Sequence, residues 1–185
     1  MIVYNFFGGP CSGKSTTAAY IFTRFKNKGI KVELAREVAK DLIWEGRAVQ
    51  LSRNQFLVSA LQYSRLKDLK ENGCEVAVTD SPVLTGIAYA ENLRYKDELE
   101  ALVRKVNLEF DNVNVFLKRS SPYQNFGRSE SETQAMWIDS RIGELTGFDL
   151  KARGNEEGQI ELFKWIWGDY LERHSVASNE CNTMG

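Results

Sequence analysis

The sequence predicts an α/β fold in which helices cover both faces of a parallel sheet. Short apolar segments alternate along the 185 residues with longer segments whose apolar residues recur at helical spacing. The first apolar segment leads into a glycine-rich loop and then into a helical segment, which is a strand–loop–helix unit. Strands that alternate with helices form parallel sheets with right-handed crossovers. The length fits a single domain with a substantial core.

The glycine-rich loop at residues 8–15 reads Gly-Gly-Pro-Cys-Ser-Gly-Lys-Ser and fits the pattern G-x-x-x-x-G-K-[ST] at every fixed position. Its glycines let successive backbone N–H groups converge, and the helix that follows adds its positive dipole end, so phosphate is the expected ligand. A turn that merely connects a strand to a helix is the alternative, which the complete spacing disfavours. The expected nucleotide contacts are Gly8, Gly9, Pro10, Cys11, Ser12, Gly13, Lys14, Ser15 and Thr16.

The remaining elements follow in order along the chain. We expect strands at 1–7, 30–34, 74–80, 113–117 and 147–150, and helices at 13–28, 38–44, 52–71, 84–90, 97–106, 131–145 and 156–173. The polar segment 118–132 is expected to form a mobile lid that carries Arg119 and Arg128. We expect residues 1–173 to form the domain and residues 174–185 to be a frayed C-terminal tail.

Composition indicates an ordinary soluble protein. Hydrophobic residues make up 43% and charged residues 26%, and the net charge of -1 provides no global basic field for nonspecific nucleic-acid binding. Three cysteines offer neither a disulfide framework nor paired zinc-ligand spacing, so a reducing cytoplasm fits best. No signal peptide or membrane span is expected.

Two carboxylates come directly after predicted strands, where open parallel sheets bind ligands. We expect Lys14 to reach the terminal phosphates, and Ser15 and Asp80 to serve a Mg²⁺ ion. Glu37 is then the group for an acceptor hydroxyl, although the two acids could exchange roles. The alternatives are a solvated first-turn helix acid for Glu37 and a turn cap before Pro82 for Asp80.

The loop alone leaves several nucleotide-dependent functions open. A GTPase is disfavoured because the base-reading motif Asn-Lys-x-Asp is absent and no glycine stands three residues after Asp80. A large ATPase motor has little room in this chain. A small kinase fits the length and the lid, where Arg128 is expected to close over the phosphates and Arg119 to contact the nucleotide. Ordinary exposed charges are the alternative for both arginines.

Four motifs together resemble a known family: the loop with its extension at 8–17, Ala-Arg-Glu at 35–37, Thr-Asp-Ser-Pro at 79–82, and Pro-Tyr-x-x-x-Gly-Arg at 122–128. They resemble bacteriophage-type P-loop kinases of the thymidylate kinase and nicotinamide riboside kinase-like group. The resemblance implies a P-loop NTPase three-layer sandwich with a five-stranded parallel sheet in order 2-3-1-4-5. It also implies an ATP·Mg²⁺ donor, an arginine-bearing lid and Asn155 near adenine.

The same resemblance implies acceptor hydroxyls on nucleosides, nucleotides or, in some phages, 5-hydroxymethyluracil within DNA, and a host cytoplasm if the protein is phage-encoded. The chain departs from cellular thymidylate kinases, because Asp80-Ser81-Pro82 stands where they have Asp-Arg-Tyr. Thymidylate is therefore a disfavoured acceptor.

Two hypotheses remain open. The first is an ATP-dependent phosphotransferase with an alcohol group as acceptor, and the second is a P-loop NTPase or nucleotide-sensing partner protein without a small-molecule acceptor. A DNA acceptor predicts a basic groove built from Arg36, Lys40, Arg47, Arg53 and the lid, whereas a free nucleotide predicts a closed pocket. A triphosphate donor other than ATP and the oligomeric state, monomer or homodimer, are also left open.

Overall fold

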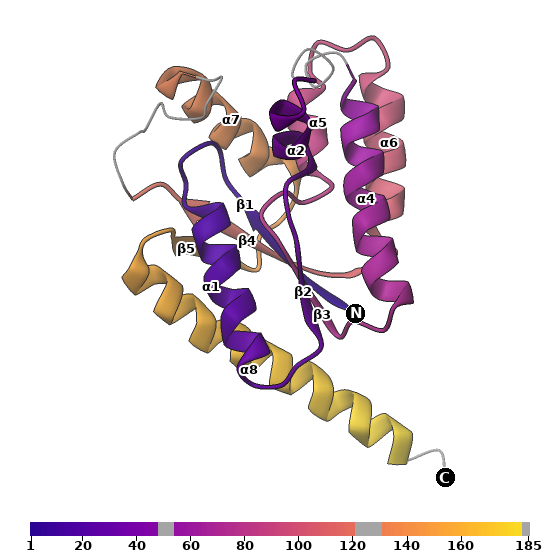
Figure 1. Cartoon of the computed structure of the whole chain (residues 1–185), viewed down its shortest axis with the longest axis vertical. Helices are drawn as coiled ribbons and strands as arrows, with labels where there is room; N and C mark the ends of the chain where they lie inside the picture. Colours follow the sequence, from indigo (N-terminus) through magenta and orange to yellow (C-terminus); the bar gives the residue numbers. More distant parts are fainter. Residues whose placement is uncertain (48–53, 121–130, 183–185) are drawn as a thin grey trace.

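The computed structural model describes residues 1–47, 54–120 and 131–182, and it contains a five-stranded parallel sheet in the order β2-β3-β1-β4-β5 (Figure 1). The strands are β1 (Ile2–Phe7), β2 (Val32–Ala35), β3 (Val76–Thr79), β4 (Asp111–Lys118) and β5 (Leu150–Arg153). The helices are α1 (Lys14–Lys26), α2 (Val38–Trp44), α4 (Gln55–Glu71), α5 (Thr85–Tyr89), α6 (Lys96–Asn107), α7 (Glu132–Leu145) and α8 (Glu156–Asn182). The sheet order that the resemblance implied is confirmed.

The central strand β1 divides the hydrophobic core into two clusters. Ile2, Tyr4 and Phe6 face α1 and α8, whereas Val3 and Phe7 face the layer formed by α4, α5, α6 and α7. All six residues of β1 are buried, as a strand covered on both faces requires. The strand therefore fixes the position of the loop that follows it, because it pairs with β3 on one side and β4 on the other.

The fifth strand differs from the prediction. It spans Leu150–Arg153 instead of 147–150, and it pairs with the end of β4 from Val115 to Lys118. Leu150 and Ala152 pack on the core while Lys151 and Arg153 are exposed, which is the alternation of an edge strand. The short apolar run before it serves a different purpose, since Phe148 packs edge-on against Phe7 and Phe116.

The last helix is longer than the sequence suggested. We expected it to end at residue 173 and a frayed tail to follow, but α8 continues to Asn182. No glycine or proline stands between 174 and 182 to interrupt it. The side chain of Ser175 donates to the Glu172 carbonyl at 2.8 Å, within the continuing helix.

Most of the predicted lid, including Arg128, lies outside the described residues; β4 runs through Lys118 and α7 begins after Ser131. The division into a domain of residues 1–173 and a tail of 174–185 stays a prediction. Among the described residues, no helix is both long enough and apolar enough to cross a membrane.

Candidate functional site

The phosphate loop, residues 8–15, leaves β1 and enters α1 through a left-handed residue. Gly13 has φ 86° and caps α1, and a Cβ at this position would lie 2.5 Å from the carbonyl oxygen of Gly154. Gly13 is therefore required both by the backbone conformation and by the close approach of the chain after β5. Cys11 also has a positive φ, 63°, and is the one such non-glycine residue in the described chain.

Lys14 points back over the loop that precedes it. Its Nζ donates to the carbonyl oxygens of Gly8 at 2.7 Å and Gly9 at 2.8 Å. The ammonium group thus lies against the backbone carbonyls at the start of the loop. Positive charge, convergent N–H groups and a helix N-terminus together form an anion-binding site.

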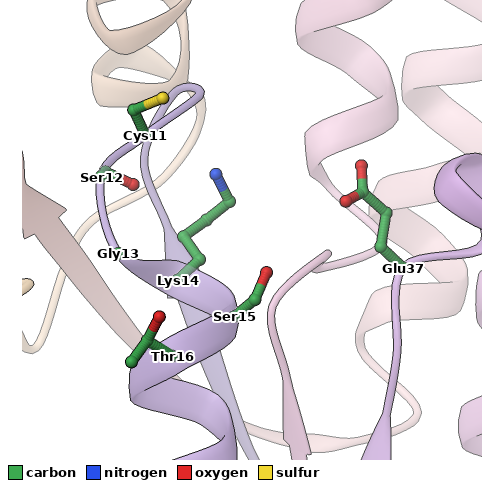
Figure 2. Close-up of a pocket in the computed structure, with 7 residues that line it drawn as sticks. All are labelled: Cys11, Ser12, Gly13, Lys14, Ser15, Thr16 and Glu37. Atoms are coloured by element: carbon green, nitrogen blue, oxygen red, sulfur yellow. The ribbon is translucent and has the colours of Figure 1, made fainter. Parts of the chain in front are cut away.

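Glu37 lies across a pocket from this loop (Figure 2). The pocket has a cavity volume of about 80 Å³ and is lined by Cys11, Ser12, Gly13, Lys14, Ser15, Thr16 and Glu37. Figure 2 shows the side chains of Lys14 and Ser15 extending into the space between α1 and Glu37. Glu37 precedes the first residue of α2, and it is brought here because β2 lies in the same sheet, with only β3 between it and β1. Its predicted role is untested by this geometry, but its location beside the loop agrees with that role.

Asp80 follows the last residue of β3, next to β1. It is 8% exposed, and its Oδ1 atom is buried without a hydrogen-bond partner among the described residues. A buried carboxylate oxygen with no partner is costly unless a ligand uses it. Ser15 is exposed in the first turn of α1.

This donor set fits a Mg²⁺ ion. The described residues include no cluster of three histidine, cysteine, aspartate or glutamate side chains that could hold a metal. Mg²⁺ does not need one, because it takes one or two protein ligands together with waters and substrate phosphates. That Asp80 and Ser15 would be those two groups stays a prediction, since Ser15 lines the pocket and Asp80 is not among its lining residues.

Asp139 is a residue beside the phosphate loop that the sequence did not predict. Its Oδ1 atom accepts a hydrogen bond from the backbone N–H of Gly9, and its Oδ2 atom pairs with Nη2 of Arg119 at 2.8 Å. Arg119 is therefore held at the phosphate loop through a carboxylate of α7. The only signal in the sequence is an acidic residue directly after Ile138, on the apolar side of a helix.

Asn155 caps a helix in this structure. Its Oδ1 atom accepts from the backbone N–H of Gly158 at 3.1 Å, in the first turn of α8. The preceding Gly154 lies against Ser12 and Gly13 of the phosphate loop, since a Cβ on Gly154 would meet the Ser12 carbonyl oxygen at 2.0 Å. The segment after β5 is thus beside the loop, while the contact of Asn155 with adenine stays a prediction.

A five-stranded parallel sheet in this order, with a complete phosphate loop after its central strand, defines a P-loop NTPase fold. Residues 3–156 match the AAA_28 family, which is described as an AAA domain. The chain belongs to this family. No curated protein matches the sequence.

Solved structures of kinases share the fold. Deoxyadenosine kinase from M. mycoides with bound dATP aligns with a TM-score of 0.60 and 20% identity, covering 91% of this chain and 100% of the kinase. The same enzyme with the products dCMP and a flexible dCDP gives a TM-score of 0.59 and 18% identity, with the same coverage. Shikimate kinase from Aquifex aeolicus is 17% identical with a TM-score of 0.49, covering 95% of this chain and 98% of that one. At these identities the likeness to deoxyadenosine kinase shows the fold alone.

Proposed function

We propose that the protein is an ATP- and Mg²⁺-dependent kinase that transfers the γ-phosphate to a hydroxyl of a nucleoside- or nucleotide-type acceptor. The observation that carries the proposal is the carboxylate of Glu37, which lines the same pocket as Lys14 and Ser15. An enzyme that transfers phosphate to an alcohol needs a group to orient or deprotonate that alcohol opposite the phosphate site. A protein that only senses a nucleotide has no such requirement.

Each residue has a distinct role in this proposal. Bound Mg²⁺·ATP supplies the phosphoryl group and the ion that offsets its charge. The Lys14 ammonium and the N–H groups of the loop hold the phosphates, and Ser15 and Asp80 serve the ion and its water shell. Glu37 accepts the hydrogen bond, and then the proton, of the acceptor hydroxyl. The exchange of roles between Glu37 and Asp80 is an outcome that the experiment below can detect.

The arginines and Asn155 complete the proposal. Arg128 closes over the phosphates and excludes water, and Arg119 contributes positive charge beside the loop. Asn155, after β5, lies on the side of the adenine. The fold likeness to deoxyadenosine kinase, whose structures hold dATP in one case and dCMP and dCDP in the other, supports a nucleoside-type acceptor.

Two acceptor sources are compared: free nucleosides or nucleotides, and 5-hydroxymethyluracil within phage DNA. Arg36 and Lys40 are exposed on α2 and the segment before it, as a DNA groove requires. Asp41 and Glu45 stand among them, and Arg47 lies 3.3 Å from Glu45. A surface with charges of both signs attracts the phosphates of DNA only weakly. We therefore propose the free acceptor and include the DNA base as a competing outcome; the fourth groove residue, Arg53, lies outside the described residues.

The test follows label from γ-labelled ATP with Mg²⁺ to nucleosides, nucleoside monophosphates, and DNA with and without 5-hydroxymethylpyrimidines. The Glu37→Gln enzyme should lose about 10²- to 10⁴-fold in kcat with little change in KM for ATP, because only the acceptor side loses its base. Lys14→Ala supplies the blank. Lys26→Ala, which changes an exposed lysine in the last turn of the same helix, is the matched control.

Label on one acceptor class, lost in the blank and kept in the control, would establish the kinase and its substrate class. Release of free phosphate alone, with every acceptor present, would replace the proposal by a P-loop NTPase or a nucleotide-sensing protein. If Asp80→Asn instead of Glu37→Gln abolished transfer without changing the Mg²⁺ requirement, the two acids would have exchanged roles.

A further inference from the structure

Gln62 is a buried polar residue that connects the two segments carrying Glu37 and Asp80. It lies on α4 and is 2% exposed. Its Oε1 atom accepts from the backbone N–H of Val38 at 3.3 Å, and its Nε2 atom donates to Oγ1 of Thr79 at 3.3 Å. The oxygen and the nitrogen of one side-chain amide thus bond to two segments, the one that follows β2 and the end of β3.

The two segments have no strand pairing of their own at this point. The ladder between β2 and β3 ends at the pair Ala35 and Thr79. Beyond it, Glu37 turns into α2 and Asp80 turns toward Pro82. Gln62 bridges these segments where the ladder stops.

Val38 shows why this bridge matters. It is the first residue of α2, so its N–H has no acceptor within the helix, and Glu37 at the N-cap provides no side-chain cap. Val38 is also only 4% exposed, which removes water as a ready partner. The amide of Gln62 supplies the missing acceptor and holds the residue next to Glu37.

Thr79 does the equivalent for Asp80. Its Oγ1 atom, which accepts from Gln62, also accepts from the backbone N–H of Ser81 at 3.1 Å. Thr79 and Ser81 flank Asp80, and the Oδ1 atom of Asp80 has no partner of its own among the described residues. The hydrogen bonds of the Thr79 hydroxyl to Gln62 and to the Ser81 backbone therefore hold the chain on both sides of Asp80.

We propose that Gln62 and Thr79 are positioning residues that hold the Glu37 and Asp80 carboxylates in a fixed relation, one at the acceptor and one at Mg²⁺. The inference rests on the proposed kinase function. Misplacement of reacting groups by an ångström is enough to reduce turnover by on the order of a hundredfold. A loosened bridge should therefore reduce turnover and the response to Mg²⁺ more than it reduces binding of ATP.

The test uses isosteric changes in the full chain. Thr79→Val keeps the shape and removes the hydroxyl, Thr79→Ser keeps the hydroxyl, and Gln62→Met removes the amide. Ser59→Ala is the matched control: Ser59 is 5% exposed on the same buried face of α4, and its hydroxyl has no partner among the described residues, so the change removes no hydrogen bond. Amide hydrogen exchange, the Mg²⁺ dependence of ATP binding, kcat and KM are measured for all four variants.

Exchange should accelerate on the order of tenfold at Ser81 in Thr79→Val and at Val38 in Gln62→Met, while Thr79→Ser and Ser59→Ala stay near the wild type. Thr79→Val and Gln62→Met should also need several-fold more Mg²⁺ for half-maximal ATP binding and lose about tenfold or more in kcat, with KM for ATP nearly unchanged.

Unchanged exchange would overturn the inference, and so would accelerated exchange with wild-type Mg²⁺ dependence and kcat, because the bridge would then be merely structural. If the wild type transfers no phosphate to any acceptor, the proposed function fails separately. Two measurements that need no phosphate transfer, the Mg²⁺ dependence of ATP binding and amide hydrogen exchange, then decide the inference.

Discussion

The carboxylate of Asp139 serves two groups of the site at once. One oxygen accepts from the backbone N–H of Gly9, and the other pairs with Arg119. The side chains of Arg119 and Asp139 are only 14% and 26% exposed, so solvent screens this pair less than it screens an ordinary surface ion pair. Neither partner can be removed without leaving a poorly hydrated charge.

A double-mutant cycle measures this coupling. Asp139→Asn keeps an oxygen that can accept from Gly9 and loses the charge that faces Arg119, whereas Arg119→Gln removes the opposite charge. We expect each single change to lower the free energy of unfolding by about 1–2 kcal/mol, and the double variant to lose less than the sum by about 1 kcal/mol. Urea unfolding of the four proteins gives the coupling energy.

The control for this cycle is Asp149→Asn combined with Arg119→Gln. Asp149 also accepts a backbone N–H, from Asn114 at 2.7 Å, whereas the ion pair of Arg119 is with Asp139. These two changes should be additive within about 0.5 kcal/mol. Additivity of the Asp139 and Arg119 changes as well would mean that the ion pair contributes nothing, and that Asp139 acts only on Gly9.

Single elements show what could be predicted from the sequence and what could not. The phosphate loop and the strands β1 to β4 follow from local patterns, because a buried strand is a short apolar run and the loop is a fixed spacing of glycines and a lysine. The strand β5 was misplaced because Lys151 and Arg153 interrupt its apolar pattern, whereas the more apolar run before it packs through Phe148 without forming a strand. Asp139 and Gln62 were missed for another reason: their partners lie 130 and 24 residues away along the chain, and no local pattern reports such contacts.

The start of α7 is fixed by a capping box, at the position where the sequence predicted a helix over 131–145. The Ser131 side chain accepts from the Gln134 N–H at 3.3 Å, and the Gln134 side chain accepts from the Ser131 N–H at 2.7 Å. We expect Ser131→Ala to lower the free energy of unfolding by about 1 kcal/mol, because the backbone N–H of Gln134 loses its acceptor and the capping box is broken. Thermal and urea unfolding measure the loss.

Ser131→Asp is the matched comparison, since aspartate is an equally good N-cap and its charge suits the helix dipole. It should restore most of the stability that alanine removes. An alanine variant as stable as the wild type would show that α7 is held only by its packing, through Ala135, Ile138 and Ile142.

At the scale of the whole molecule, the sheet separates two cores of different character. The cluster under α1 and α8 is rich in aromatic rings, with Phe25 in contact with Tyr4, Phe163, Trp167 and Tyr170. Its two buried tyrosines reach acidic partners at its margin: Tyr4 donates to Asp169 at 2.9 Å and Tyr170 to Glu75 at 3.2 Å. This core therefore contains phenols that must stay protonated.

Alkaline pH should destabilise the fold through these phenols. Burial, and then the Glu75 carboxylate, raise the pKa of Tyr170 to about 12, and burial together with Asp169 raises the pKa of Tyr4. A tyrosine in the unfolded chain has a pKa of about 10. Between these values the unfolded state releases protons that the folded state keeps, so stability is complete below about pH 10 and falls as the pH rises toward 12.

Tyr170→Phe should therefore flatten the fall in stability between pH 10 and 11.5, by on the order of 1–2 kcal/mol relative to the wild type. At pH 8 the same change should cost about 1 kcal/mol, because the hydrogen bond to Glu75 is lost. Urea midpoints across this pH range measure both effects, with Tyr20→Phe as the comparison, since Tyr20 packs against the same cluster. Equal alkaline slopes for the wild type and Tyr170→Phe would locate the pH sensitivity outside the aromatic core. A flatter slope would show that the helix layer of α1 and α8, in which α1 begins at the phosphate loop, weakens as its buried phenol ionises.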